Sequence, residues 1–78
     1  MTLTEIDQLV DARGLACPMP IVKTAQAIKA MASGQVLEVL ATDPGAVKDF
    51  AAWSKATGNQ IIESNEDAGT YRFLIVRK

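Results

Sequence analysis

The sequence predicts an α/β protein, a two-layer α/β sandwich with the order β-α-β-α-β-β. Short apolar runs rich in β-branched residues alternate with two stretches in which apolar side chains recur at helical spacing. The last two apolar runs are separated only by a polar loop, which is typical of a hairpin. Helices between strands imply crossover connections, so the sheet is expected to be mixed and four-stranded, with both helices on one face.

The first half of the chain predicts a strand over residues 6–12, a loop over 13–16 and a helix over 18–32. Pro18 suits the first turn of a helix, where its missing N–H costs no hydrogen bond. Gly34 follows the last turn and suits a helix end. The side chains expected on the inner face of this helix are Ile21, Val22, Ala25, Ile28 and Ala32.

The second half predicts a buried strand over residues 36–41 and a helix that begins at Asp43 and Pro44. Asp43 is expected to cap this helix, with Pro44 at its first position. Its expected inner stripe is Val47, Phe50, Ala51 and Ser54, and we expect Trp53 at the edge of the core. Strands over 60–63 and 70–76 are expected to flank a polar loop over 65–69.

Length and composition restrict the class of protein. The 78 residues suit one domain over 1–78, and 8 basic against 9 acidic residues give a net charge of -1. Direct nucleic-acid binding is not expected from this balance. We see no apolar stretch near the ~18 residues needed to cross a bilayer, so no membrane partner is expected. The first ten residues do not resemble a secretory signal, and a single cysteine suits a reducing compartment, so we expect a cytoplasmic protein.

Cys17 is the candidate for chemistry. It directly precedes Pro18 at a predicted helix start, where the helix dipole favours an anion such as the reactive thiolate. Pro20 adds a second proline to the first turn, and we expect the two prolines mainly to fix the shape of the loop. A small buried hydrophobic role for Cys17 is the alternative, since lone cysteines often have one.

Several kinds of chemistry are excluded within this chain. It contains no histidine and no second cysteine, so it offers no Cys–His pair, no two-cysteine redox cycle and no zinc cluster. We therefore expect no cofactor, no metal and no independent catalysis. A role in which Cys17 holds a group and passes it on fits what remains.

The run RGLACPMP over residues 13–20 resembles the TusA/SirA family of small sulfur-carrier proteins, through its Arg-Gly-Leu-x-Cys-Pro-x-Pro pattern. The resemblance extends over nearly the whole chain and includes residues 43–44, 49–53 and 57–59. It implies the same βαβαββ sandwich. It also implies a sulfurtransferase-type carrier in which Cys17 accepts a sulfane sulfur as a persulfide and delivers it to an acceptor protein.

The resemblance also implies partners. The donor is expected to be a cysteine desulfurase or a rhodanese-like protein, and the acceptors serve tRNA thiolation, molybdenum cofactor synthesis or sulfur oxidation. Ser54 and Asn59 depart from the family pattern, because many members have cysteine and histidine there. The residues expected to bind partners or the persulfide are Arg13, Gly14, Pro18, Met19 and Pro20.

Two alternatives remain open from the sequence. Arg13 is either a contact for the persulfide anion or a solvated loop charge. The whole loop is either a sulfur-loading site or a rigid docking surface of a regulatory or interaction module that moves no sulfur.

Overall fold

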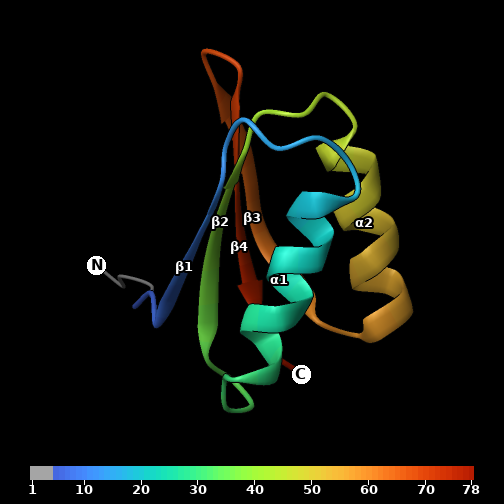
Figure 1. Ribbon diagram of the computed structural model, residues 1–78. Helices are drawn as coiled ribbons and strands as arrows, with labels where there is room; N and C mark the ends of the chain where they lie inside the picture. The colour runs from blue at the N-terminus through green and yellow to red at the C-terminus, as the bar shows by residue number, and fades with distance from the viewer. Residues whose placement is uncertain (1–4) are drawn as a thin grey trace.

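A computed structural model describes residues 5–78 and confirms the predicted order of elements (Figure 1). The elements are β1 (Gln8–Ala12), α1 (Met19–Lys29), β2 (Val36–Ala41), α2 (Ala46–Thr57), β3 (Gln60–Asp67) and β4 (Thr70–Val76). The two helices cover one face of the sheet, so the two-layer α/β sandwich is confirmed.

The sheet is mixed, with the strand order β1-β2-β4-β3. The β1 and β2 strands pair in parallel, whereas β2 with β4 and β3 with β4 pair antiparallel. Because β1 and β2 are parallel, the loops that leave their carboxyl ends emerge at the same end of the sheet. Both helices begin at this end, which is uppermost in Figure 1.

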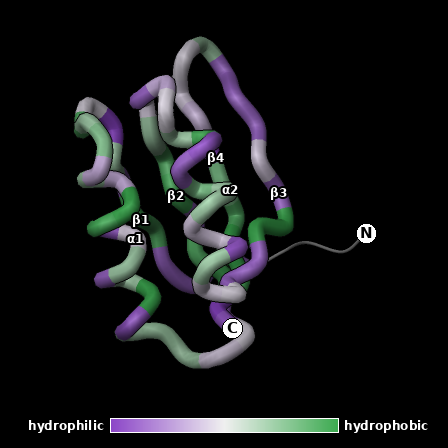
Figure 2. The backbone as a smooth tube through the Cα atoms, turned by 90° about the vertical axis from the view of Figure 1, so that its right-hand side faces the viewer, coloured by the Kyte–Doolittle hydropathy of each residue, from purple (hydrophilic) through white to green (hydrophobic). Residues whose placement is uncertain are grey.

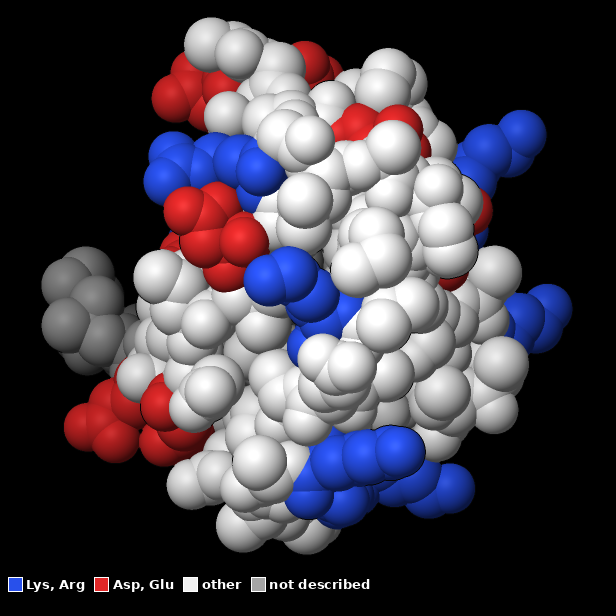
Figure 3. All heavy atoms as spheres, viewed as in Figure 1, with Lys and Arg blue, Asp and Glu red and all other residues white. Residues whose placement is uncertain are grey.

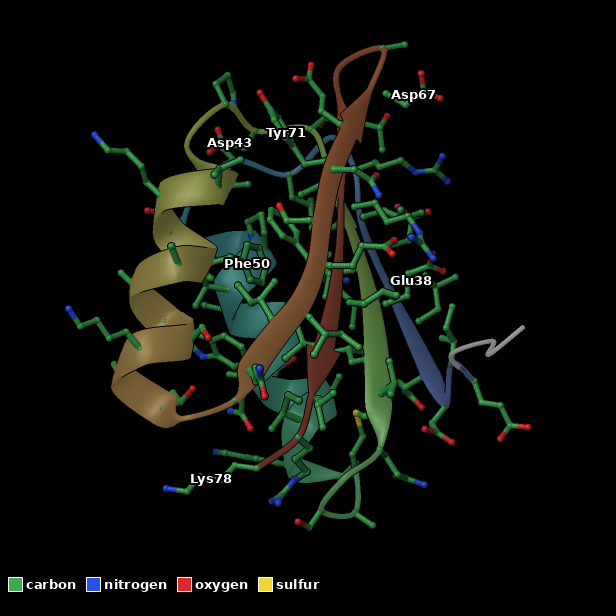
Figure 4. All side chains as sticks on the ribbon, turned by 180° about the vertical axis from the view of Figure 1, so that it is seen from behind. Glu38, Asp43, Phe50, Asp67, Tyr71 and Lys78 are labelled. Carbon is green, nitrogen blue, oxygen red and sulfur yellow. The ribbon has the colours of Figure 1, made fainter. Side chains whose placement is uncertain are left out.

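The core lies between the sheet and the helices and is centred on Phe50 of α2. Phe50 points toward the sheet (Figure 4) and stacks on Phe73 of β4, with ring centroids 4.6 Å apart. Trp53 meets Phe50 edge-on at 6.1 Å and is only partly buried, which confirms the expected place at the core edge. In Figure 2 green predominates where the central strands β2 and β4 lie, whereas much of β3 is hydrophilic.

The first helix is shorter than predicted and turned about its axis. It ends at Lys29, because the N–H groups of Ala30 and Met31 bond three residues back and tighten the chain. Val22 is exposed and Thr24 is buried, so the predicted inner face is displaced. The side chains that α1 buries are Pro20, Thr24 and Ile28.

The second helix begins at Ala46, two residues after the predicted first position at Pro44. Asp43 does not occupy the N-cap position; its Oδ2 accepts the Gly45 N–H at 3.1 Å in a turn before the helix. The predicted inner stripe is wrong at Val47 and at Ala51, both of which are exposed. The buried residues of α2 are Ala46 and Phe50.

The predicted polar loop over residues 65–69 is wrong, because most of it continues the hairpin. Residues 65–67 of β3 pair with Arg72, Tyr71 and Thr70, and the turn is reduced to Ala68 and Gly69. Both have positive φ, 52° and 86°, as a two-residue type I′ turn requires. These polar residues were predicted to form a loop because β3 is an edge strand whose side chains are mostly exposed.

The first strand, β1, begins at Gln8, two residues later than predicted.

We predict that Phe50→Ala lowers the free energy of unfolding by about 3–5 kcal/mol, because it leaves a cavity between α2 and the sheet. The total free energy of unfolding expected for a chain of this size is roughly 4–12 kcal/mol. Urea unfolding followed by circular dichroism measures the loss. Val47→Ala, on the exposed side of the same helix, is the control and should cost less than about 0.5 kcal/mol. Equal losses for the two variants would contradict the assignment of Phe50 to the core.

Candidate functional site

The candidate site lies in the loop that joins β1 with α1. Two successive turns shape it: the Leu15 N–H donates to the Ala12 carbonyl at 3.3 Å, and the Met19 N–H donates to the Ala16 carbonyl at 2.9 Å. Cys17 and Pro18 lie at the centre of the second turn, joined by a cis peptide bond.

Gly14 fixes this loop to its neighbour. Its φ of 79° lies in the left-handed region, which favours glycine. Its N–H donates to Oγ1 of Thr42 at 2.9 Å, and Thr42 belongs to the loop that follows β2. The loops after the two parallel strands are therefore bonded directly to each other.

The Cys17 thiol is exposed and points to the start of α2. Its Sγ–H donates to Oδ2 of Asp49, with sulfur and oxygen 2.9 Å apart. Asp49 lies in the first turn of α2, and its backbone N–H donates to the Gly45 carbonyl. The site therefore joins residues 32 positions apart in the chain.

A second carboxylate lies beside the first. A Cβ added to Gly45 would be 3.1 Å from Oδ2 of Asp43 and 3.7 Å from Oδ2 of Asp49. Both carboxylates therefore flank the Gly45 backbone, and a larger residue there would press on them. Figure 4 shows Asp43 in the loop directly before α2.

The electrostatics of Cys17 differ from the sequence expectation. The hydrogen bond to Asp49 raises the pKa of the thiol, and desolvation and the charges of Asp49 and Asp43 raise it further. The helix start was expected to favour a thiolate, but the resting sulfur is held as a thiol. Sequence reasoning assigned no role to Asp49; its place in the first turn of the helix after a parallel strand was the available signal.

Arg13 is engaged by Asp11 and has no described hydrogen bond or ion pair with Cys17. Its guanidinium donates to both carboxylate oxygens, at 2.9 Å from Nε and 2.8 Å from the terminal nitrogen. This pairing lowers the pKa of Asp11 to about 2. A contact between Arg13 and a persulfide stays a prediction and would compete with Asp11.

The other predicted binding residues divide into exposed and buried positions. Pro18 and Met19 are exposed beside Cys17, and 43% of the Met19 surface is accessible, whereas Pro20 is buried and anchors α1. The thiol thus lies on an open, partly apolar surface.

Two features of the surface around this site concern its shape and its charge. A groove of about 400 Å³ lies between β1 and α1, with Asp11 and Lys23 in its lining, but Cys17 is not part of that lining. On the face shown in Figure 3, acidic side chains lie at the top and on the left, whereas a group of basic side chains lies at the bottom, at the opposite end from the loops that carry the site. Neither helix is long and apolar enough to span a membrane, within residues 5–78.

Ser54 and Asn59 lie at the far end of α2 from Asp49. The Ser54 hydroxyl donates to the Asn59 carbonyl at 2.6 Å, and Asn59 Oδ1 accepts the Lys78 N–H at 2.8 Å. Asn59 is buried, and its amide also donates to Oγ1 of Thr57. These two residues therefore close the end of the helix and take no part in the described contacts of Cys17.

Fold and site together define a small α/β domain that presents a single thiol on its surface. Comparison with known families gives its class. Residues 8–77 match the family model described as Sulfurtransferase TusA, and the chain belongs to this family.

Relatives of known sequence and structure agree with this membership. The sulfur carrier protein TusA of Allochromatium vinosum is 53% identical over 73 residues, covering 94% of this chain and 96% of the relative. The putative sulfur carrier protein YrkI of Bacillus subtilis is 49% identical over 69 residues, covering 88% and 92%. The crystal structure of a SirA-like protein from Desulfitobacterium hafniense superimposes with a TM-score of 0.78 at 25% identity, covering 88% of this chain and 95% of that one.

We predict that Asp49→Asn lowers the pKa of the Cys17 thiol, because it removes the carboxylate that stabilises the protonated form. The rate of alkylation by iodoacetamide, which reports the thiolate, should then be higher in the variant at neutral pH. The midpoint of its pH–rate profile should lie at lower pH than in the wild type. Asp43→Asn, which removes only a more distant charge, should move the profile less. Superimposable profiles of wild type and Asp49→Asn would contradict the hydrogen bond.

We also predict that Arg13→Ala raises the pKa of Asp11 from about 2 toward its ordinary value of 3.8. The lowered pKa of Asp11 stabilises the fold at pH values above the ordinary carboxyl pKa of 3.8, and this contribution is lost as the pH falls toward 2. Since the pair is exposed, the effect on stability should be small. Carboxyl chemical shifts followed by NMR against pH measure the change. An Asp11 pKa near 2 in the variant would exclude Arg13 as its cause.

Proposed function

We propose that this protein is a sulfur carrier, in which Cys17 accepts a sulfane sulfur as a persulfide and passes it to an acceptor protein. The observation that carries the proposal is the exposed free thiol of Cys17, at the turn before α1. Family membership and relatives that are named sulfur carriers, aligned over nearly their full length, support it.

The proposed chemistry is thiol–persulfide exchange. During loading, Cys17 Sγ attacks the outer sulfur of a donor persulfide; the new Sγ–S bond forms while the donor's S–S bond breaks, and the donor leaves as a thiol. During discharge, an acceptor thiolate attacks the outer sulfur on Cys17, and Sγ leaves and regains a proton. Each exchange conserves the number of disulfide-type bonds, so no outside oxidant is needed.

The form of the site suits visits by two different proteins. The exposed apolar side chains of Pro18 and Met19, which directly follow Cys17 in the chain, offer contact area for transient docking. Gly14 holds the loop through its hydrogen bond to Thr42, and Pro20 holds it through its buried side chain. We propose a cysteine desulfurase or rhodanese-like protein as donor, with the carrier acting as a sulfurtransferase-type intermediate and not as an independent catalyst.

We predict that incubation with a cysteine desulfurase and cysteine adds one sulfur to the intact protein, observed by mass spectrometry. The adduct should be removed by a thiol reductant and should be absent from Cys17→Ser. Ser54→Ala, which leaves the thiol untouched, is the control and should load like the wild type. If neither a desulfurase nor a rhodanese-like donor loads the wild type, the loop is a docking surface that moves no sulfur and the proposal is wrong.

A further inference from the structure

The contact between Cys17 and Asp49 bears on how firmly the carrier holds its sulfur. In the resting protein the Sγ–H is a hydrogen-bond donor, and the Asp49 carboxylate is its acceptor at 2.9 Å. An ionised carboxylate has no hydrogen to donate, so it acts only as a hydrogen-bond acceptor. The contact therefore requires a proton on the sulfur and stabilises the unloaded state.

Loading removes that proton from Sγ. In the persulfide, Sγ is bonded to carbon and to the outer sulfur, and it has no hydrogen to donate. Persulfides are more acidic than the corresponding thiols, so near neutral pH the loaded group is an anion. Loading thus exchanges a neutral donor for an anion at the same carboxylate.

The charged groups near the sulfur have one sign. Asp49 from α2 and Asp43 from the preceding loop both act on Cys17, and both disfavour a negative charge there. Arg13, from the loop of Cys17 itself, is paired with Asp11. Within residues 5–78, no hydrogen bond or ion pair brings a lysine or arginine to the thiol.

We infer that Asp49 sets the sulfur-transfer equilibrium of Cys17 toward discharge, by stabilising the thiol and repelling the persulfide anion. This inference rests on the proposed function and gives it a direction. The equilibrium between unloaded and loaded protein then lies toward the unloaded form, which suits transfer of sulfur more than its storage. Asp49 acts here as a positioning and charge-setting residue and forms no covalent bond with sulfur.

The balanced exchange that tests this is R–S–S⁻ + Cys17–SH → R–SH + Cys17–S–S⁻, with glutathione as R. The Sγ–S bond forms, the S–S bond of glutathione persulfide breaks, and the thiol proton passes to the departing glutathione sulfur. Protein is equilibrated with a fixed ratio of glutathione persulfide to glutathione, and the loaded fraction is read by intact-protein mass spectrometry.

Near neutral pH, Asp49→Asn should raise the ratio of loaded to unloaded protein by about 3- to 10-fold, the size expected for one hydrogen bond at an accessible site. Glu66→Gln is the matched control. It removes one exposed carboxylate from β3 that has no described contact with Cys17, and its ratio should equal that of the wild type. The discharge rate of loaded Asp49→Asn with glutathione should fall as its loading rises.

The pH dependence separates this effect from a structural one. At a pH above the pKa of the Cys17 thiol, where alkylation by iodoacetamide has reached its plateau, both states of Cys17 are anions, so Asp49 repels both and the difference between wild type and Asp49→Asn should disappear. A difference that persists unchanged at that pH, or equal loading of the two proteins near neutral pH, would overturn the inference. Failure of the wild type to load at all would instead overturn the proposed function.

Discussion

The parallel pairing of β1 with β2 is the constraint on which the site depends. The register runs from Gln8 opposite Leu37 to Ala12 opposite Ala41, so the two strands end level with each other. The loops that follow leave the same end of the sheet and are joined by the bond between Gly14 and Thr42. A slip of one residue would turn Val10 and Ala12 of β1 away from the core. Burial of these side chains therefore fixes where Cys17 emerges.

The core also determines where the carboxylate of the site lies. Asp49 directly precedes Phe50, and successive residues on a helix differ by about 100° in direction. Phe50 is fully buried and stacks on Phe73, which fixes the rotation of α2 about its axis. With that rotation fixed, Asp49 faces the end of α1 where Cys17 lies. A side chain of the core thus holds the hydrogen bond of an exposed site.

The sequence predicted the elements because their signals are local, and it failed where long-range packing decides. Helical spacing located both helices, but it could not tell Val22, which is exposed, from Thr24, which is buried, since the neighbouring helix and sheet select the inner face. Polar residues 65–67 form a strand only because β4 pairs with them. Cys17 was found from its local motif. Asp49 was not, because its contact joins residues 32 positions apart.

The protonation of Cys17 follows from the relative strength of two opposing effects. A helix start offers only about half an elementary charge, carried by its unpaired N–H groups. At α1 this source is depleted: Pro18 and Pro20 have no N–H, and the Met19 N–H is bonded to the Ala16 carbonyl. Against it stand a full charge and a hydrogen bond from Asp49 at 2.9 Å, with Asp43 adding to the same sign. The carboxylates prevail, so the pKa of the Cys17 thiol is raised and the protonated form is favoured. Because the thiolate is the reactive form of cysteine, this arrangement reduces the reaction of Cys17 with oxidants and electrophiles.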